Sequence, residues 1–391
     1  MFNSYRDVRG KMRESFRYSE TGKPRKRKII IFDERVSPDS WTQILSECRG
    51  HILERLPLVN GVVALVDDDE VRDVQALVGT RSGVIRVDDD IDIEMAYEVG
   101  PLAWGPKFAE SVPWGVSRVR PNSLEYTGRG VKVAVLDTGI DTGHPDLGAN
   151  VRGTYNAMGH AASARDDNGH GTHVAGTIGA LRNGIGVQGV APRASLYAVK
   201  VLDAQGSGKL SSLVGGLSWC VEKGIRVLNM SLSSGRDNQT FREAIQNARR
   251  AGLTMVCAAG NSGPGADTVG YPAKYVETIA VAATAEDDNI ADFSSRGREV
   301  DLCAPGVDIL SAWPGRKYRK SSGTSMAAPH VTGAVALLLE ADSSLSPSDI
   351  KSALQATADR LDGPSYEEQG SGIINIGKAL ERVSKKRMSV V

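Results

Sequence analysis

The sequence predicts an α/β fold with a mostly parallel central sheet, helices on both faces, and a small α+β domain in front of it. After residue 109, short apolar segments alternate with helical ones, which is typical of a parallel sheet covered on both faces. With 391 residues, of which 41% are hydrophobic, the chain can form one large and one small domain. The apolar segments predicted as strands are residues 131–136, 195–202, 225–230, 253–258 and 278–283.

The small domain is predicted over residues 29–97, where the segments follow the β-α-β-β-α-β order of a ferredoxin-like domain. Residues 29–32 form an apolar strand, Ser37-Pro38 is a helix-start signal, and Asn60-Gly61 is typical of a turn. This topology occurs in proteins of many functions, so it indicates none by itself. The predicted division of the chain is a basic disordered tail (1–28), the small domain (29–97), a linker (98–108), the large domain (109–384) and a C-terminal tail (385–391).

The charges of the chain balance, with 47 basic and 47 acidic residues. This favours neither nucleic acid nor a membrane surface as a partner. Residues 1–28 are the exception, with ten basic and three acidic residues, and a solvated tail is preferred there over a nucleic-acid-binding or lipid-binding arm. We expect a cytoplasmic protein, because no run of 18 apolar residues and no secretory signal is present; secretion by a non-classical route is the alternative.

The four cysteines, Cys48, Cys220, Cys257 and Cys303, form no CxxC pair. Cys220 lies in a helical pattern and Cys257 in an apolar strand, so we expect buried free thiols rather than disulfides.

The first two of three motifs carry Asp137 and His170. Asp137 ends an apolar strand before Thr138-Gly139, where a carboxylate can orient an imidazole; an ordinary turn is the alternative. His170 lies in the run His-Gly-Thr-His-Val-Ala-Gly-Thr and can serve as a general base, with a structural histidine as the alternative. His173 follows three residues later, but this spacing is not that of an HExxH zinc site.

The third motif, Gly-Thr-Ser-Met-Ala, carries Ser325 at the start of an apolar helical segment. Free N–H groups and the positive end of the helix dipole favour a developing oxyanion there, although a helix-capping serine is the alternative. Asn261 in Ala-Ala-Gly-Asn follows a strand, and its amide can donate to a tetrahedral intermediate; a plain turn is the alternative.

Together these segments resemble the subtilisin-like serine proteases of the subtilase family, close to the bacterial true subtilisins. Asp137, His170 and Ser325 follow in that family's order, 33 and 155 residues apart. The resemblance extends over residues 109–384 and implies a serine endopeptidase. It implies that Ser325 attacks the carbonyl, His170 transfers the proton, Asp137 holds the tautomer, and Asn261 with the Ser325 N–H forms the oxyanion hole.

The resemblance also implies a substrate cleft between two extended segments, which gives affinity without sequence selectivity. Selectivity comes from a primary pocket, which binds the P1 residue, the residue whose carbonyl is attacked. This pocket lacks an acidic floor, so we expect large apolar or aromatic residues at P1. A second apolar pocket includes Leu213, for which an ordinary core leucine is the alternative. The implied residues are Gly206, Ser207 and Gly208, and Ser231, Leu232 and Ser233 for the cleft; Ala258, Gly260 and Gly270, with Ser262 at the rim, for the primary pocket; and Leu210 with Leu232 for the second.

A structural Ca²⁺ site is a further implication of the resemblance. Asp146 and Asn183 would supply side-chain oxygens, which suit a hard cation. Glu110 stands where close relatives carry glutamine, so it would supply oxygen and add charge. Backbone carbonyls would come from Leu181, Ile185 and Val187.

In position and predicted topology, residues 29–97 resemble the family's inhibitory propeptide. This implies self-cleavage after Tyr97, with Trp104 and Phe108 as alternatives, followed by inhibition by the bound prodomain. The expected partners are therefore protein or peptide substrates and the chain's own prodomain.

Two other classes of protein remain as alternatives. A catalytically silent homologue is disfavoured because Asp137, His170, Asn261 and Ser325 are all intact. A metallohydrolase that uses His170 and His173 would be recognised by sensitivity to chelators.

Overall fold

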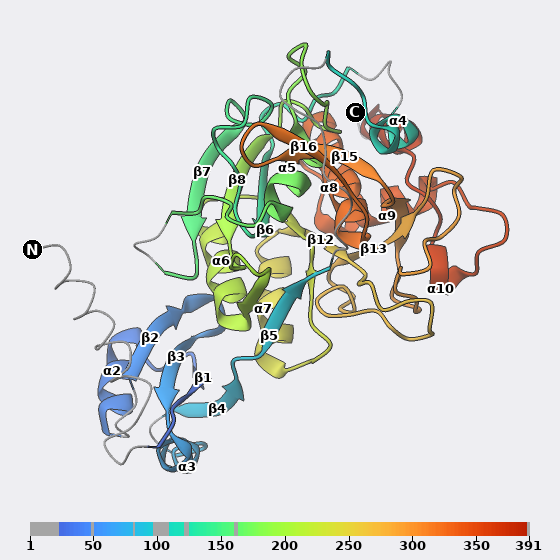
Figure 1. The fold of residues 1–391 in the computed structure, drawn as a ribbon. Coiled ribbons are helices and arrows are strands. Elements are labelled where there is room, and N and C mark those ends of the chain that lie inside the picture. The colour runs from blue at the N-terminus through green and yellow to red at the C-terminus, as the bar shows by residue number, and fades with distance from the viewer. Residues whose placement is uncertain are drawn as a thin grey trace, which may run out of the picture. The chain divides into compact units, whose positions relative to one another are not determined.

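The computed structural model describes residues 23–47, 51–80, 83–96, 109–120, 125–159 and 163–388. The chain divides into two compact units, Met1–Ile91 with Asn238–Ala244 and Asp92–Asp237 with Ile245–Val391. Figure 1 shows the elements of both units. Among the described helices, none is long and apolar enough to cross a membrane.

The first unit is built on a four-stranded antiparallel sheet with the order β2-β3-β1-β4. Trp41 and Leu45 of one helix and Val74 of the other pack on one face of the sheet, against Ile30 and Phe32. The observed order is the β-α-β-β-α-β expected from the sequence. The elements are β1 (Lys26–Phe32), α2 (Pro38–Glu47), β2 (His51–Leu56), the 3-10 helix η1 (Pro57–Val59), β3 (Gly61–Val66), α3 (Asp68–Ala76) and β4 (Val84–Asp89).

Local signals explain where these elements begin and end. Asp67 caps α3 by accepting hydrogen bonds from the N–H groups of Asp69 and Glu70, and the Glu70 carboxylate accepts from the Asp67 N–H in return. Asn60 adopts a left-handed conformation with φ of 50°, which turns the chain from η1 into β3.

The second unit contains a seven-stranded parallel sheet with the order β14-β13-β12-β10-β6-β8-β7. This confirms the predicted α/β class and adds two edge strands that the sequence did not indicate. The sheet strands are β6 (Lys132–Asp137), β7 (Val151–Asn156), β8 (Ser195–Lys200), β10 (Val227–Met230), β12 (Thr254–Ala258), β13 (Ile279–Thr284) and β14 (Leu302–Pro305).

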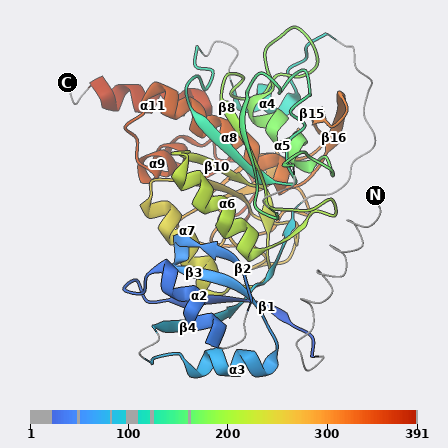
Figure 2. The same cartoon turned by 90° about the vertical axis from the view of Figure 1, so that its left-hand side faces the viewer.

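Helices cover both faces of this sheet, as Figure 2 shows from the side. Val133 and Val135 of β6 share one apolar core with the long helix α8, whereas Leu136 and Val199 lie beside Gly216 of α6. Because neighbouring strand residues point to opposite faces, α6 and α8 lie on opposite sides. The helices are α4 (Trp114–Val119), α5 (His170–Gly179), α6 (Leu210–Glu222), α7 (Gln239–Arg250, shared by both units), α8 (Thr324–Ala341), α9 (Pro347–Thr357), α10 (Tyr366–Gln369) and α11 (Ile376–Met388).

Two small antiparallel sheets complete the second unit. One has the order β11-β5-β9 and joins β5 (Asp92–Met95), β9 (Ser207–Lys209) and β11 (Leu232–Ser233). The other is a hairpin of β15 (Ile309–Trp313) and β16 (Lys317–Ser321). As expected, Cys220, Cys257 and Cys303 are buried free thiols, and Cys48 lies outside the described residues.

The first unit holds a carboxyl group that titrates far from its usual range. Burial raises the pKa of Glu54 on β2 to about 7; the nearby Arg27 opposes this shift and Asp90 adds to it. Because the folded-state pKa lies above the unfolded one, Glu54 contributes stability at acid pH that is lost as the pH rises through about 7.

We expect Glu54→Gln to make the first unit more stable above pH 7, since an uncharged amide replaces the half-buried carboxylate. The measurement is hydrogen exchange of β1 and β3 at pH 6 and pH 9, corrected for the intrinsic rates, in the full chain carrying Ser325→Ala. Glu34→Gln, which alters an exposed carboxylate of the same unit, is the control. If Glu54→Gln and Glu34→Gln lost the same amount of hydrogen-exchange protection between pH 6 and pH 9, the expectation would be contradicted.

Candidate active site

The three motif residues meet at the carboxyl edge of the parallel sheet. Asp137 is the last residue of β6, His170 is the first of α5, and Ser325 is the second of α8. All three are fully buried. Parallel strands end together and the helices begin there, so side chains far apart in sequence are brought to one place.

Asp137 and His170 form the central contact of the site. The Nδ1 atom of His170 lies 2.7 Å from Oδ1 of Asp137, and that oxygen also accepts a hydrogen bond from the Thr138 N–H at 2.7 Å. A carboxylate on Nδ1 fixes the tautomer in which Nδ1 carries the proton, which leaves Nε2 to act as a base.

Ser325 contacts a carbonyl oxygen of the chain itself, and Asn261 is bonded to the residue before Ser325. The Ser325 N–H donates to the Ala96 carbonyl oxygen at 3.2 Å, and the Ser325 Oγ donates to the Ser231 carbonyl at 3.0 Å. Oδ1 of Asn261 accepts from the N–H and the hydroxyl of Thr324. This fixes which way the amide points, and the buried Nδ2 has no hydrogen-bond partner among the described residues. Ser325 N–H and Asn261 Nδ2 are therefore donors suited to an oxyanion.

The strand β5 lies in the cleft predicted for a substrate. It pairs antiparallel with β9 on one side, where Ile93 faces Gly208, and with β11 on the other, where Met95 faces Leu232. The Met95 N–H donates to the Gly206 carbonyl at 3.0 Å, and the Ala96 N–H donates to the Ser231 carbonyl at 3.3 Å. Ser207 and Ser233 complete the two edges. The cleft is thus bordered by the six residues named from the sequence, and residues 92–96 occupy it. The residues named as cut sites, Tyr97, Trp104 and Phe108, lie outside the described residues.

The residues named for the pockets lie around this strand. Ala258 ends β12, Gly260 follows it, and both are buried, as is Gly270. A Cβ on Gly270 would lie 3.1 Å from Cβ of Ser233. The glycine therefore leaves space that a side chain at this position would fill. Leu210, Leu213 and Leu232 are fully buried. A cavity of about 590 Å³ opens along the strand; it is lined by Asp92, Glu94, Met95, Ala96, Ser233, Ser234, Gly235, Arg236, Asn261 and Ser262.

The residues named for calcium meet in the loop after α5. Oδ2 of Asp146 accepts a hydrogen bond from the Val187 N–H at 3.0 Å. Nδ2 of Asn183 lies 3.3 Å from Oδ1 of Asp146. Oε2 of Glu110 accepts from the N–H groups of Asn183 and Gly184. The loop also includes Leu181, whose N–H donates to the Asp146 carbonyl, and Ile185, which bridges to Ala109. The carboxylate oxygens of Asp146 and Glu110 thus lie against this loop and accept hydrogen bonds from its N–H groups; oxygen ligands are the kind that calcium prefers.

The second histidine of the motif does not complete a metal site. Nε2 of His173 lies 2.9 Å from the Ile309 carbonyl and 3.0 Å from that of Arg319, and burial lowers the pKa of His173 to about 3. Within the described ranges, no three His, Cys, Asp or Glu side chains gather in a way that would hold a metal. His173 therefore anchors the β15–β16 hairpin to α5.

Asp166 is a residue of the site that the sequence analysis did not name. Its carboxylate is 4% exposed and accepts hydrogen bonds from Thr138 Oγ1, the N–H groups of Asn168 and Gly169, and both the N–H and the hydroxyl of Thr172. Thr138 follows Asp137, and the other three residues flank His170. One carboxylate thus fixes both partners of the 2.7 Å contact.

Lys200 supports the same loop from β8, where it pairs with Asp137 in the strand register. Its ammonium group donates to the carbonyls of Thr138 and Leu202 and to Oδ1 of Asp167. Asp166 lies four residues before the start of α5 and outside the N-cap position, which is Gly169, so the sequence carries no capping signal for it. The contacts of Lys200 follow only from the strand register.

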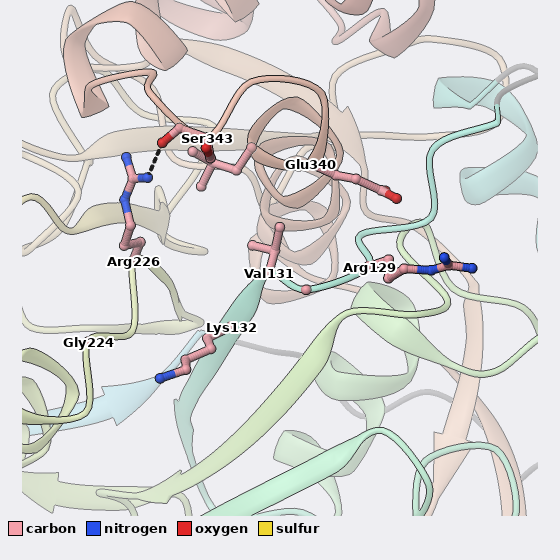
Figure 3. A pocket seen from close by; sticks show the side chains of 9 residues that line it. Arg129, Val131, Lys132, Gly224, Arg226, Glu340 and Ser343 are labelled. Carbon is pink, nitrogen blue, oxygen red and sulfur yellow. Dashed lines mark hydrogen bonds between the residues drawn. The ribbon is translucent and has the colours of Figure 1, made fainter.

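Another cavity, of about 370 Å³, lies at the opposite end of the sheet, where β6 and β10 begin. Figure 3 shows its cations pointing away from one another. Lys132 donates to the Lys223 carbonyl, and Arg226 donates to the carbonyls of Ser343 and Leu345. Because these cations diverge, the cavity is not a candidate site.

Comparison with known proteins agrees with this geometry. The profile of the subtilase family (Peptidase_S8) matches residues 128–372. An alkaline protease of Alkalihalobacillus alcalophilus is 42% identical over 350 residues, which cover 89% of this chain and 87% of that protein. Subtilisin E of Bacillus subtilis is 40% identical over 365 residues, 91% of each chain. Subtilisin Savinase of Lederbergia lenta is 49% identical over 270 residues, 68% of this chain and 98% of that protein.

We expect Asp166→Asn to lower kcat about tenfold to a hundredfold with little change in KM. The amide nitrogen would face the N–H and hydroxyl of Thr172, and a lost charge-assisted hydrogen bond is worth about 1.5–3 kcal/mol. Steady-state kinetics on one peptide checks this. Asp167→Asn, which removes the exposed neighbouring carboxylate bonded to Lys200, is the matched control. Equal kcat values for the two variants would show that Asp166 does not position the site.

Proposed function

The chain belongs to the subtilase family and is a subtilisin-like serine endopeptidase, and from this we propose that it is made as a self-processing precursor. In the proposed mechanism Ser325 Oγ attacks the substrate carbonyl while Nε2 of His170 accepts its proton. Asp137 stabilises the resulting imidazolium through Nδ1. The oxyanion accepts hydrogen bonds from the Ser325 N–H and from Nδ2 of Asn261. The observation that carries the proposal is the Ala96 carbonyl at the Ser325 N–H.

The register of β5 supports one bond for self-cleavage. The residue whose carbonyl meets the Ser325 N–H is the P1 residue, and here it is Ala96. We therefore propose hydrolysis of the Ala96–Tyr97 bond, one residue before the cut proposed from the sequence. His170 returns its proton to the Tyr97 nitrogen as that amine leaves. The fragment that would end at Ala96 is the proposed intramolecular inhibitor, because β5, its last strand, fills the cleft.

For other substrates, we propose a preference for large apolar or aromatic P1 residues. Ala258, Gly260 and Gly270 supply small uncharged walls and no acidic floor that would bind Lys or Arg. Leu210 and Leu232 form the proposed second apolar pocket. Main-chain pairing with β9 and β11 supplies affinity that does not depend on sequence.

We also propose that one structural Ca²⁺ is held by the loop after α5. Asp146, Asn183 and Glu110 would supply side-chain oxygens, and Leu181, Ile185 and Val187 would supply carbonyls. The ion would stabilise the loop electrostatically, and it takes no part in the chemical step.

The self-processing proposal predicts that the wild-type chain divides into two fragments whose larger one begins at Tyr97, whereas Ser325→Ala stays whole. The physical reason is the loss of the proposed nucleophile, whose N–H donates to the Ala96 carbonyl. Intact mass and N-terminal sequencing of both purified proteins check this. A fragment beginning at Glu98 would support the register proposed from the sequence instead.

A mixing experiment distinguishes cleavage within one chain from cleavage by another molecule, including a contaminating protease. The wild-type protein is added to the Ser325→Ala chain, which carries a mass tag, and cleavage of the tagged chain is followed over dilution. Cleavage in cis is independent of concentration. Identical fragments from both proteins prepared separately would leave self-processing without support.

The calcium proposal predicts that saturating Ca²⁺ raises the Tm of the Ser325→Ala chain by about 5 °C over the chelated protein, since a ligand at 100 times its Kd stabilises by about 2.7 kcal/mol. Asp146→Asn should abolish most of this shift. Asp362→Asn, at an exposed carboxylate, should keep it. A calcium shift of equal size in all three proteins would contradict the assignment of this loop.

A further inference from the structure

The strand that occupies the cleft carries two carboxylates on one face. Side chains of a strand alternate between its faces, so Asp92 and Glu94 point to the same side as Ala96. Asp92 and Glu94 are exposed, whereas Ile93 between them is buried. Counted back from Ala96 as P1, the acidic residues stand at P3 (Glu94) and P5 (Asp92) of the proposed cut.

Asp92 meets a cation on one edge of the cleft, Lys209 of β9. The two residues are direct partners in the antiparallel pairing of β5 with β9. Nζ of Lys209 lies 2.5 Å from Oδ1 of Asp92, with 39% of the lysine side chain and 70% of the aspartate side chain exposed. Departure of β5 from the cleft would take this carboxylate away and leave the ammonium group at the cleft edge.

Glu94 shares a cavity with a second cation, Arg236, which follows β11 on the other edge of the cleft. Ser233 of β11 is the direct partner of Glu94. The chain turns after Ser233, because Oγ of Ser234 accepts a hydrogen bond from the Arg236 N–H at 3.2 Å. Arg236 and Glu94 both line the cavity of about 590 Å³ that opens along β5.

Among the described residues that line this cavity, Arg236 carries the one charge that does not belong to the bound strand. Within the described part of the chain, Arg236 enters no ion pair, and Lys209 pairs with Asp92 alone. Each edge of the acyl half of the cleft thus offers one cation to a bound peptide. The other lining residues outside the strand are uncharged: Ser233, Ser234, Gly235, Asn261 and Ser262.

Two carboxylates of the second unit lie close in sequence to these cations, and each is held by other groups. Asp203 accepts hydrogen bonds from the N–H groups of Gln205 and Ser207. Asp237 accepts a hydrogen bond from the Tyr275 hydroxyl. Neither carboxylate lines the cavity along β5. They weaken the attraction of the two cations for an acidic peptide without occupying the place of its side chains.

We propose that Lys209 and Arg236 select substrates with Asp or Glu at P5 and P3. The proposal rests on the proposed function and adds a substrate class to it. Opposite charges on facing strands stabilise the pairing of those strands, and exposed pairs of this kind contribute modestly. The two cations therefore alter how well a peptide is cleaved and take no part in the chemical step.

The test uses the active enzyme obtained from the full chain and four quenched fluorescent peptides built on residues 91–100. One peptide has the natural sequence, two carry D92N or E94Q, and the fourth carries both changes. We expect each change to lower kcat/KM about threefold at low salt, and the two changes together about tenfold. These ratios should fall toward one in 1 M NaCl, where charges are screened beyond about 3 Å. Product masses identify the cut bond, and cleavage at a bond other than Ala96–Tyr97 would overturn the register on which the proposal depends.

Enzyme variants assign each preference to one cation. K209Q should no longer distinguish the natural peptide from D92N but should still distinguish it from E94Q, and R236Q should show the reverse. R382Q, which removes one charge from an exposed position of α11, should keep both preferences. Equal cleavage of all four peptides by the wild type, or unchanged ratios in K209Q and R236Q, would overturn the proposal. An enzyme that cleaves none of the four peptides would overturn the proposed function, and this inference with it.

Discussion

The geometry of the site depends on one buried carboxylate. Asp166 accepts five hydrogen bonds from groups on both sides of the Asp137–His170 contact. A buried charge is stable only when such donors surround it, and the N-terminus of α5 supplies them as free N–H groups. The groups that donate hydrogen bonds to the Asp166 carboxylate also hold the end of β6 and the start of α5 at a fixed separation.

The parallel sheet positions the other residues of the site. Its strands bring Asp137 and Asn261 to one edge, and α5 and α8 begin at that edge with His170 and Ser325. The hydrogen bonds of Asn261 Oδ1 to Thr324 then tie the proposed oxyanion donor to the helix that carries Ser325, the proposed nucleophile. Each catalytic group is thus positioned by a neighbour that is itself held by backbone contacts, which keeps the site preorganised.

The sequence predicted those parts of the structure that leave a local pattern. Central strands are continuous apolar runs, and the motifs around His170 and Ser325 are long enough to be specific. The edge strands β7 and β14 escaped prediction because one alternates half-buried and exposed residues and includes Gly153, and the other is short and ends in Pro305. Asp166 and the register of Ala96 depend on contacts between distant segments, which no local pattern reports. Choosing Tyr97 by its size could not reveal which carbonyl the strand pairing brings to Ser325.

The occupation of the cleft by β5 sets the kinetics of access. A strand tethered to the same chain competes at an effective concentration of about millimolar, whatever the dilution of the protein. A substrate present at micromolar concentration therefore waits for the strand to depart, and adding more enzyme does not shorten that delay. For the proposed precursor, before its chain is cut, the onset of proteolysis would then be timed by a dissociation rate within each molecule and would be independent of protein concentration.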